Sequence, residues 1–256
     1  MVRDGKWWLG EPVWVTAEKQ GQRAANYFWP GSEAAIDGIH STIWTGYNGK
    51  VPDDLRVDRV LSWLDKPQSE RPTFITLYFS TTDDVGHEFG PDSEETRYGV
   101  ADVDARIARL MAGLRVRKLD NRVNVIITSD HGMTNYYAKQ AVIVDEKFDA
   151  NDAEQVLWAS PLVQIFPKPG KLESIFDRIK NLERVKCWKK ADIPARFFYS
   201  TGKRVAPIIC LAENGWMVSN RKWYDDWYKG LDDPERPRGA HGYDNVLPEM
   251  RATFIA

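Results

Sequence analysis

Short apolar runs alternate with amphipathic stretches through the first half of the chain. Residues 24–29 and 73–79 are rich in apolar and aromatic side chains, so both predict strands; the first ends at Pro30-Gly31. Residues 11–21 predict a helix with Pro12 in its first turn and Gly21 at its end. Residues 53–64 predict an amphipathic helix, because apolar side chains recur there at helical spacing until Pro67 follows.

The longest predicted helix covers residues 92–114, and its apolar stripe is typical of a core-facing surface. Asp92 and Glu95 have the spacing of a capping box at its start. Residues 123–129 then form a β-branched run of the kind that lies in a parallel sheet buried on both faces. This order of strands and helices predicts an α/β fold with a mostly parallel central sheet and helices on both faces.

The second half of the chain has a mixed pattern. Residues 171–181 predict a helix, and residues 221–238 predict a long polar surface loop. Short strands are predicted at residues 140–144, 162–166, 184–188, 206–211 and 216–218. No linker-like stretch separates the two halves, so we expect residues 1–256 to form a single domain.

Composition narrows the functional classes. The formal charge of −2 argues against a general binder of polyanions, so we expect no stable nucleic-acid partner. No apolar run is long enough for a membrane span, and no signal peptide opens the sequence. The chain has 11 Trp and 10 Tyr, which is more aromatic surface than its core needs, so part of it is expected to contact a ligand.

The two cysteines lie in apolar runs that are candidates for neighbouring strands. Cys187 belongs to residues 184–188, and Cys210 belongs to residues 206–212. A disulfide and two buried free thiols both fit this pattern. The cysteines alone therefore leave the redox compartment open.

Three of the four histidines lie beside glycine and a carboxylate, at positions expected to fall outside regular elements. They occur in Asp83-x-x-x-His87, in Asp130-His131 and in the stretch that begins at His241. The first two follow predicted parallel strands, whose carboxyl ends line the crevice in which α/β proteins bind ligands. Aspartate and histidine are ligands of zinc and similar ions. Five such ligands are too many for one open site and one too few for two three-ligand sites.

These motifs, together with others along the chain, identify a family. The sequence resembles the nucleotide pyrophosphatase/phosphodiesterase family of the alkaline phosphatase superfamily over essentially its full length. The resemblance rests on four ordered motifs: Trp-Pro-Gly-Ser (29–32), Asp-x-x-Gly-His (83–87) followed by Gly-Pro, Ser-Asp-His-Gly-Met (129–133) and His-Gly-Tyr-Asp-Asn (241–245). It implies an alkaline-phosphatase-like fold.

The resemblance also implies two zinc ions. Asp83, His87 and His241 match the ligands of one zinc, and Asp130 and His131 match ligands of the second. In the family the second zinc also takes an Asp and the nucleophilic Thr from a segment upstream of the motifs found here. We therefore expect the catalytic domain to lack an N-terminal segment and its C-terminal end, and the second site to bind metal weakly in this chain.

The implied reaction is the hydrolysis of nucleotide pyrophosphate or phosphodiester bonds through a covalent phospho-threonine, which releases nucleoside 5′-monophosphates. The nucleophilic Thr is expected upstream, so the fragment alone is expected to be inactive. By resemblance, Tyr47 stacks on the nucleobase, Tyr78 and Trp29 line the same pocket, and Glu33 lies near the base. Core packing is the alternative role for Trp29 and Tyr78. His40 matches no ligand.

Two alternatives stay open. The substrate of such an enzyme could instead be a choline phosphodiester or a lysophospholipid. The chain could also be a non-catalytic module that binds metal or nucleotide, because the nucleophile is missing. Family members usually work outside the cell, so the resemblance implies an extracellular or periplasmic location.

Overall fold

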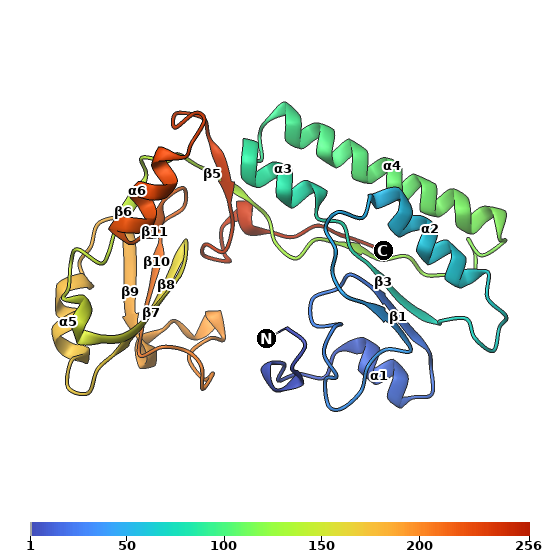
Figure 1. The fold of residues 1–256 in the computed structure, drawn as a ribbon, viewed down its shortest axis with the longest axis horizontal. Helices are drawn as coiled ribbons and strands as arrows, with labels where there is room; N and C mark the ends of the chain where they lie inside the picture. Colours follow the sequence, from blue (N-terminus) through green and yellow to red (C-terminus); the bar gives the residue numbers. More distant parts are fainter. Residues whose placement is uncertain (1) are drawn as a thin grey trace. The chain divides into compact units, whose positions relative to one another are not determined.

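The computed structural model describes residues 2–256, which fold into two compact units of mixed α/β structure (Figure 1). The first unit runs up to Asp83 and includes Tyr98–Asn124. The second combines Asp84–Arg97 with Val125–Ala256. Each unit therefore contains a segment that is not contiguous with the rest of it.

The first unit is built on a three-stranded parallel sheet in the order β2 (Ile43–Thr45), β1 (Ala24–Tyr27), β3 (Phe74–Leu77). Alternate side chains of β1 point to opposite faces, as the pleat requires. Ala24 packs with Trp14 and Val15 of α1 (Val13–Lys19), whereas Ala25 packs with Val60 and Trp63 of α2 (Asp53–Leu64). Helices therefore cover both faces of this sheet, as the sequence predicted.

The long helix α4 (Glu94–Val116) is fixed to α2 by close packing and paired charges. A Cβ on Gly113 would lie 2.4 Å from Leu61 Cδ1, so the missing side chain allows the helices to approach. The guanidinium groups of Arg109 and Arg117 each form two hydrogen bonds of 2.7–2.9 Å with one carboxylate, that of Asp58 and that of Asp65 respectively.

Two predictions about this region are wrong. The cap of α4 is Ser93, whose Oγ accepts from Thr96 N–H at 3.1 Å, while Asp92 accepts from the Asn135 side chain. Serine is as good a cap as aspartate, and Ser93 stands one residue closer to the helix. His87 was expected outside a regular element but lies in α3 (Thr81–Phe89), because the helix continues through Gly86.

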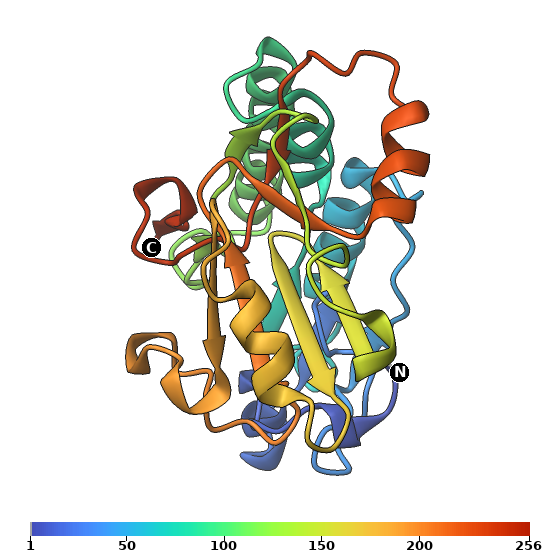
Figure 2. The same cartoon turned by 90° about the vertical axis from the view of Figure 1, so that its left-hand side faces the viewer.

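The second unit contains an antiparallel sheet in the order β7 (Ala153–Ala159), β8 (Leu162–Pro167), β10 (Ile208–Ala212), β9 (Val185–Lys189). Helix α5 (Leu172–Ile179) lies across one face of the sheet (Figure 2). There Ile175 and Ile179 pack with Val163, Ile165 and Ile208. A second cluster on this sheet contains Ile193, Val205, Ala206 and Ile209. Residues 190–206 therefore supply part of the apolar packing around the sheet.

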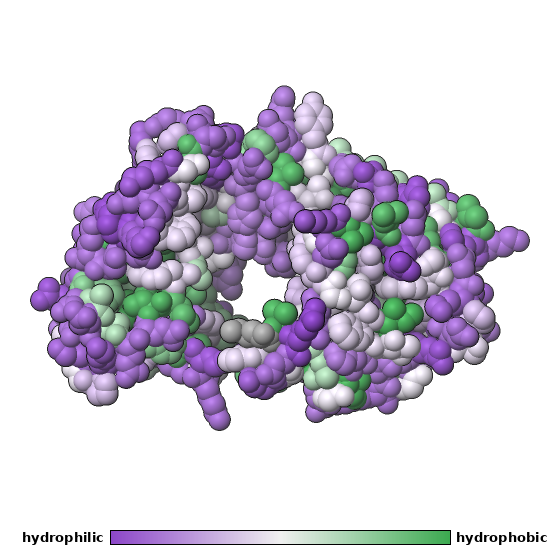
Figure 3. All heavy atoms as spheres, in the orientation of Figure 1, coloured by the Kyte–Doolittle hydropathy of each residue, from purple (hydrophilic) through white to green (hydrophobic). Residues whose placement is uncertain are grey.

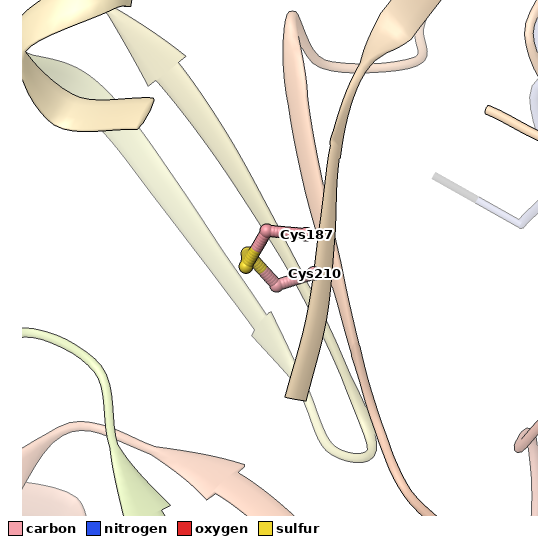
Figure 4. The surroundings of a disulfide bond; sticks show 2 residues. All are labelled: Cys187 and Cys210. Atoms are coloured by element: carbon pink, nitrogen blue, oxygen red, sulfur yellow. A yellow bond between two sulfur atoms is a disulfide. The ribbon is translucent and has the colours of Figure 1, made fainter. Parts of the chain in front are cut away.

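The two cysteines form a disulfide between neighbouring strands of this sheet (Figure 4). Cys187 of β9 stands directly opposite Cys210 of β10 in the antiparallel register, with a Cα–Cα distance of 4.0 Å. Of the two states that the sequence left open, the structure therefore has the disulfide.

Three two-stranded pairs complete the second unit: β11 (Met217–Ser219) with β6 (Ala141–Ile143), β12 (Arg238–Ala240) with β5 (Thr134–Tyr136), and β13 (Phe254–Ile255) with β4 (Ile127–Thr128). The prediction of a buried parallel strand at residues 123–129 is wrong, because β4 has two residues and pairs antiparallel. Ile126 is 61% exposed there. The β-branched run favours extended backbone, but burial depends on neighbouring elements, and the neighbour here is the short, exposed strand β13.

The expected loop at residues 221–238 begins with a helix, α6 (Arg221–Lys229). Its cap is Asn220, whose side chain accepts from Trp223 N–H at 2.8 Å. On the faces of the units seen in Figure 3, hydrophilic residues predominate and hydrophobic residues form small separate patches. Within residues 2–256, no helix combines the length and the apolar character needed to cross a membrane.

Candidate active site

Three potential metal ligands lie together on α3 and on the stretch that follows β12. Asp83, His87 and His241 each offer a ligand atom, and all these atoms lie within 4.8 Å of one another. Asp83 and His87 are four residues apart on α3, so they occupy the same face of the helix. One carboxylate and two imidazoles are a donor set that suits zinc with an open coordination position.

Two glycines bring His87 and His241 together. A Cβ on Gly239 of β12 would lie 2.2 Å from the Gly86 carbonyl oxygen and 2.4 Å from Met133 Sδ, so β12 touches α3 backbone to backbone. His87 Nδ1 lies 2.8 Å from the Gly239 carbonyl oxygen, to which it donates. This hydrogen bond places the proton on Nδ1, which makes Nε2 the nitrogen with the lone pair that a metal needs.

The segment around His241 is held by its downstream neighbours. Tyr243 is buried and donates from its hydroxyl to the Trp216 carbonyl oxygen at 2.8 Å; burial raises the pKa of this phenol above its usual range. The Arg196 guanidinium beside Asp244 lowers the pKa of that carboxyl. The apolar anchor and the ion pair therefore fix the backbone on which His241 stands.

Asp130 and His131 follow β4 and also lie near His241. The His131 and His241 rings stack with centroids 3.5 Å apart and planes 12° apart, and Asp130 Oδ2 is 3.5 Å from His131 Nε2. The backbone here is tightly packed, because a Cβ on Gly132 would lie 2.0 Å from the Glu249 carbonyl oxygen. Within residues 2–256, however, only Asp83, His87 and His241 form a group of three close donors. The ligand role of Asp130 and His131 stays a prediction.

The aromatic residues expected to bind a base lie in the first unit. Tyr47 is 53% exposed and meets the rings of Phe28 and Tyr78 edge-on, at centroid distances of 5.4 and 6.2 Å. Glu33 accepts from Tyr47 N–H at 2.9 Å. Trp29 is half-buried and packs with Trp14 and Val15 of α1, which is the core role considered from sequence. The His40 ring stacks on that of Trp44, with centroids 4.6 Å apart.

Sequence reasoning missed several residues that position the site. Gly86 and Gly239 each stand within two residues of a histidine of the cluster, and that adjacency was a usable signal. Arg56 is the other omission, a charged residue between Leu55 and Val57 on an otherwise apolar stretch of α2. Its side chain is only 2% exposed, and a buried charge needs a partner.

The sequence matches a family model described as type I phosphodiesterase / nucleotide pyrophosphatase over residues 2–244. The chain belongs to this family. It is 35% identical to the venom phosphodiesterase of Macrovipera lebetinus over 259 residues, which are 98% of the chain and 29% of that protein. It is 32% identical to human ectonucleotide pyrophosphatase/phosphodiesterase family member 5, covering 51% of that protein.

Solved structures agree with the family assignment. Murine ectonucleotide pyrophosphatase/phosphodiesterase 5 superposes with a TM-score of 0.86 and 30% identity, covering 98% of this chain and 64% of the murine one. An inactive threonine-to-alanine variant of the same murine protein, in complex with AMP, matches equally well, with a TM-score of 0.86. The expected fold class, α/β of the alkaline-phosphatase-like type, is thereby confirmed. The chain spans about half of the human relative and less than a third of the venom relative.

Proposed function

We propose that the protein containing this chain hydrolyses nucleotide pyrophosphate or phosphodiester bonds with the help of two zinc ions and releases nucleoside 5′-monophosphates. The observation that carries the proposal is the convergence of Asp83, His87 and His241 in a member of a metal-dependent phosphodiesterase family. The AMP complex of the murine relative supports a nucleotide as the ligand.

The five proposed ligands would be divided between the two zinc ions. Asp83, His87 and His241 would hold one zinc, and Asp130 and His131 would contribute to the second. Bound zinc would supply charge neutralisation at the phosphate and a lower pKa for a bound hydroxyl or water. The hydrogen bond from His87 Nδ1 to Gly239 orients the imidazole before any metal binds.

We further propose a covalent phospho-threonine. The threonine oxygen would form a bond to phosphorus as the bond to the leaving-group oxygen breaks, and water would then release the nucleoside monophosphate and restore the threonine. The inactivity of the murine threonine-to-alanine variant supports this step. The motifs of this chain that match the family do not include the one that carries the nucleophilic threonine.

Base recognition would come from Tyr47, whose ring meets that of Tyr78 edge-on. Trp29, expected from the resemblance to line the same pocket, packs with Trp14 and Val15 and is assigned to the core. The half-exposed Tyr47 ring offers a face for stacking, and stacking tolerates any base. The substrate class is therefore a nucleotide or related phosphodiester, and no stable nucleic-acid partner is proposed.

Turnover of two chromogenic esters tests the proposal, using the complete gene product. The p-nitrophenyl ester of TMP should be hydrolysed in the presence of zinc. This hydrolysis should stop on treatment with EDTA and resume when zinc is added. Asp83→Asn and His241→Ala should abolish turnover, whereas His40→Ala, a histidine stacked on Trp44, should not. Preference for p-nitrophenylphosphocholine would indicate a choline-phosphodiester or lysophospholipid enzyme. Absence of zinc-dependent turnover of either ester would leave a non-catalytic binding module.

We also propose an extracellular or periplasmic location. The relatives include venom and ectonucleotide enzymes, and the Cys187–Cys210 disulfide fits an oxidising compartment. Thiol alkylation of freshly lysed cells would test this: the two cysteines should be protected until a reductant is added.

A further inference from the structure

The Glu33 carboxylate anchors the loop that carries Tyr47, and each of its two oxygens accepts a hydrogen bond. Glu33 Oε1 accepts from Tyr47 N–H at 2.9 Å, and Glu33 Oε2 accepts from Arg3 Nε at 2.9 Å. The Glu33 side chain is only 15% exposed. Because each oxygen of Glu33 is already hydrogen-bonded to another part of the chain, the Glu33 side chain is placed to hold the loop.

The backbone of the Tyr47 loop passes close to the ion pair of Arg3 and Glu33. A Cβ on Gly46 would lie 3.1 Å from Arg3 Nη2 and 3.5 Å from Glu33 Oε2. The chain therefore passes directly over the ion pair immediately before Tyr47, and the pair fixes the point at which the loop leaves β2.

Arg56 anchors the other side of the same loop. Its guanidinium donates to three main-chain carbonyl oxygens: Val51 at 3.0 Å, Tyr78 at 3.0 Å and Gly49 at 3.5 Å. It also pairs with Asp53 at 3.2 Å and lies 5.2 Å from the Phe28 ring, which meets Tyr47 edge-on. One buried cation thus connects the loop after Tyr47 with the backbone of Tyr78.

We propose that Glu33 and Arg56 are positioning residues that hold the Tyr47 ring in its stacking orientation before a nucleotide arrives. The inference rests on the proposed nucleotide function. A loop ordered in advance loses less entropy when a ligand binds. If the ordered loop becomes a tenth as populated, the apparent affinity for a base-bearing ligand falls about tenfold.

The experiment compares AMP with ribose 5-phosphate, which has the same phosphate and sugar but no base. Dissociation constants of both are measured by calorimetry on the zinc-loaded protein. Glu33→Ala should weaken AMP about tenfold and leave ribose 5-phosphate unchanged. Glu33→Gln should have a smaller effect, because its amide carbonyl still accepts from Tyr47 N–H while the ion pair with Arg3 is lost. Tyr47→Ala should remove the preference for AMP and so weaken AMP binding by about 5- to 150-fold.

One control and one further test variant separate positioning from general damage. Glu70→Ala removes a surface glutamate that pairs with Lys66 and should change the affinity for neither ligand. Arg56→Lys keeps the charge but cannot reach three carbonyls at once, so it should weaken AMP selectively. If Glu33→Ala does not fold, the positioning role is tested by the AMP and ribose 5-phosphate affinities of Glu33→Gln and Arg56→Lys.

The pH dependence provides a further readout. The Tyr47 N–H, and then Arg3, hold the pKa of the Glu33 carboxyl below its ordinary value of 4.5. The anchor is therefore complete above that value and is lost as pH falls through the lowered pKa, so the AMP preference should stay constant between about pH 7 and pH 5.

The outcomes are distinguishable. A wild-type AMP preference that Tyr47→Ala removes but Glu33→Ala and Arg56→Lys leave intact would overturn the positioning role alone. A wild-type protein that binds AMP no better than ribose 5-phosphate would overturn the base-binding function and, with it, this inference.

Discussion

Gly239→Ala is the sharpest test of how the metal ligands are assembled. The new Cβ would lie 2.2 Å from the Gly86 carbonyl oxygen, whereas real Cβ contacts under 3.0 Å are essentially never seen. β12 would therefore have to move away from α3 by about 0.8 Å. The hydrogen bond from His87 Nδ1 to the Gly239 oxygen, now 2.8 Å, would lengthen to about 3.6 Å and be lost.

Loss of a hydrogen bond that orients a metal-bound histidine typically weakens metal affinity about 10- to 100-fold. Overpacking should also cost about 1–3 kcal/mol of unfolding free energy. For a chain of this size that corresponds to a decrease in Tm of about 2–12 °C. The substitution should therefore reduce metal affinity strongly while the protein still folds.

Zinc affinity is measured by competition with a chromogenic chelator at a temperature well below the Tm of the variant. Gly10→Ala is the matched control, because a Cβ there would have no neighbour within 4 Å. His87→Ala sets the value expected for full loss of one ligand. Wild-type zinc affinity in a folded Gly239→Ala protein would refute the reasoning. Absence of zinc binding by the wild type would instead refute the metal proposal itself.

Three further predictions concern stability. Replacing Cys187 and Cys210 together by alanine opens a cross-link with a sequence separation of 23 and should cost about 3 kcal/mol in chemical denaturation, with no further loss on adding reductant. Ser93→Ala should cost about 1 kcal/mol through loss of the α4 cap, whereas Glu95→Ala should have little effect on the thermal midpoint. The Arg196 guanidinium lowers the pKa of Asp244 below 3.8, so this pair stabilises the fold above that pH and loses its effect as pH falls through the lowered pKa. Arg196→Gln should therefore lower Tm at pH 7, and this decrease should become smaller as pH falls below 3.8.

The regular elements that the sequence predicts well are those with a strong local signal. Residues 53–64 were expected to be a helix and are α2 with the same bounds, because Pro52, the apolar spacing and Pro67 all agree. The strand at residues 123–129 fails because its burial depends on neighbouring strands. Helix α6 was missed because its aromatic and charged residues resemble those of a polar loop, and the capping role of Asn220 was not recognised.

For the candidate site, the identities of the metal ligands were easier to predict than the contacts that hold those ligands in place. The residue types indicated five metal ligands, and the family resemblance assigned Asp83, His87 and His241 to one ion. The structure brings the ligand atoms of these three residues together. The contacts that hold them are non-local: His87 and Gly239 are 152 positions apart. The same is true of the anchoring of Tyr47 by Glu33 and of the disulfide, whose pairing needed the β9–β10 register. No local pattern encodes such approaches.

The discontinuous make-up of the second unit has a consequence for synthesis. Residues 84–97 carry His87 and belong to a unit whose remaining residues begin only at Val125. Ribosomes add about 5–20 residues per second, so the 152 positions between His87 and Gly239 take about 8–30 s to make. Throughout that time His87 is on the nascent chain without the carbonyl oxygen that fixes its tautomer. The donor cluster of Asp83, His87 and His241 can therefore close only late in the translation of this segment, after every strand of the three-stranded and four-stranded sheets has been synthesised.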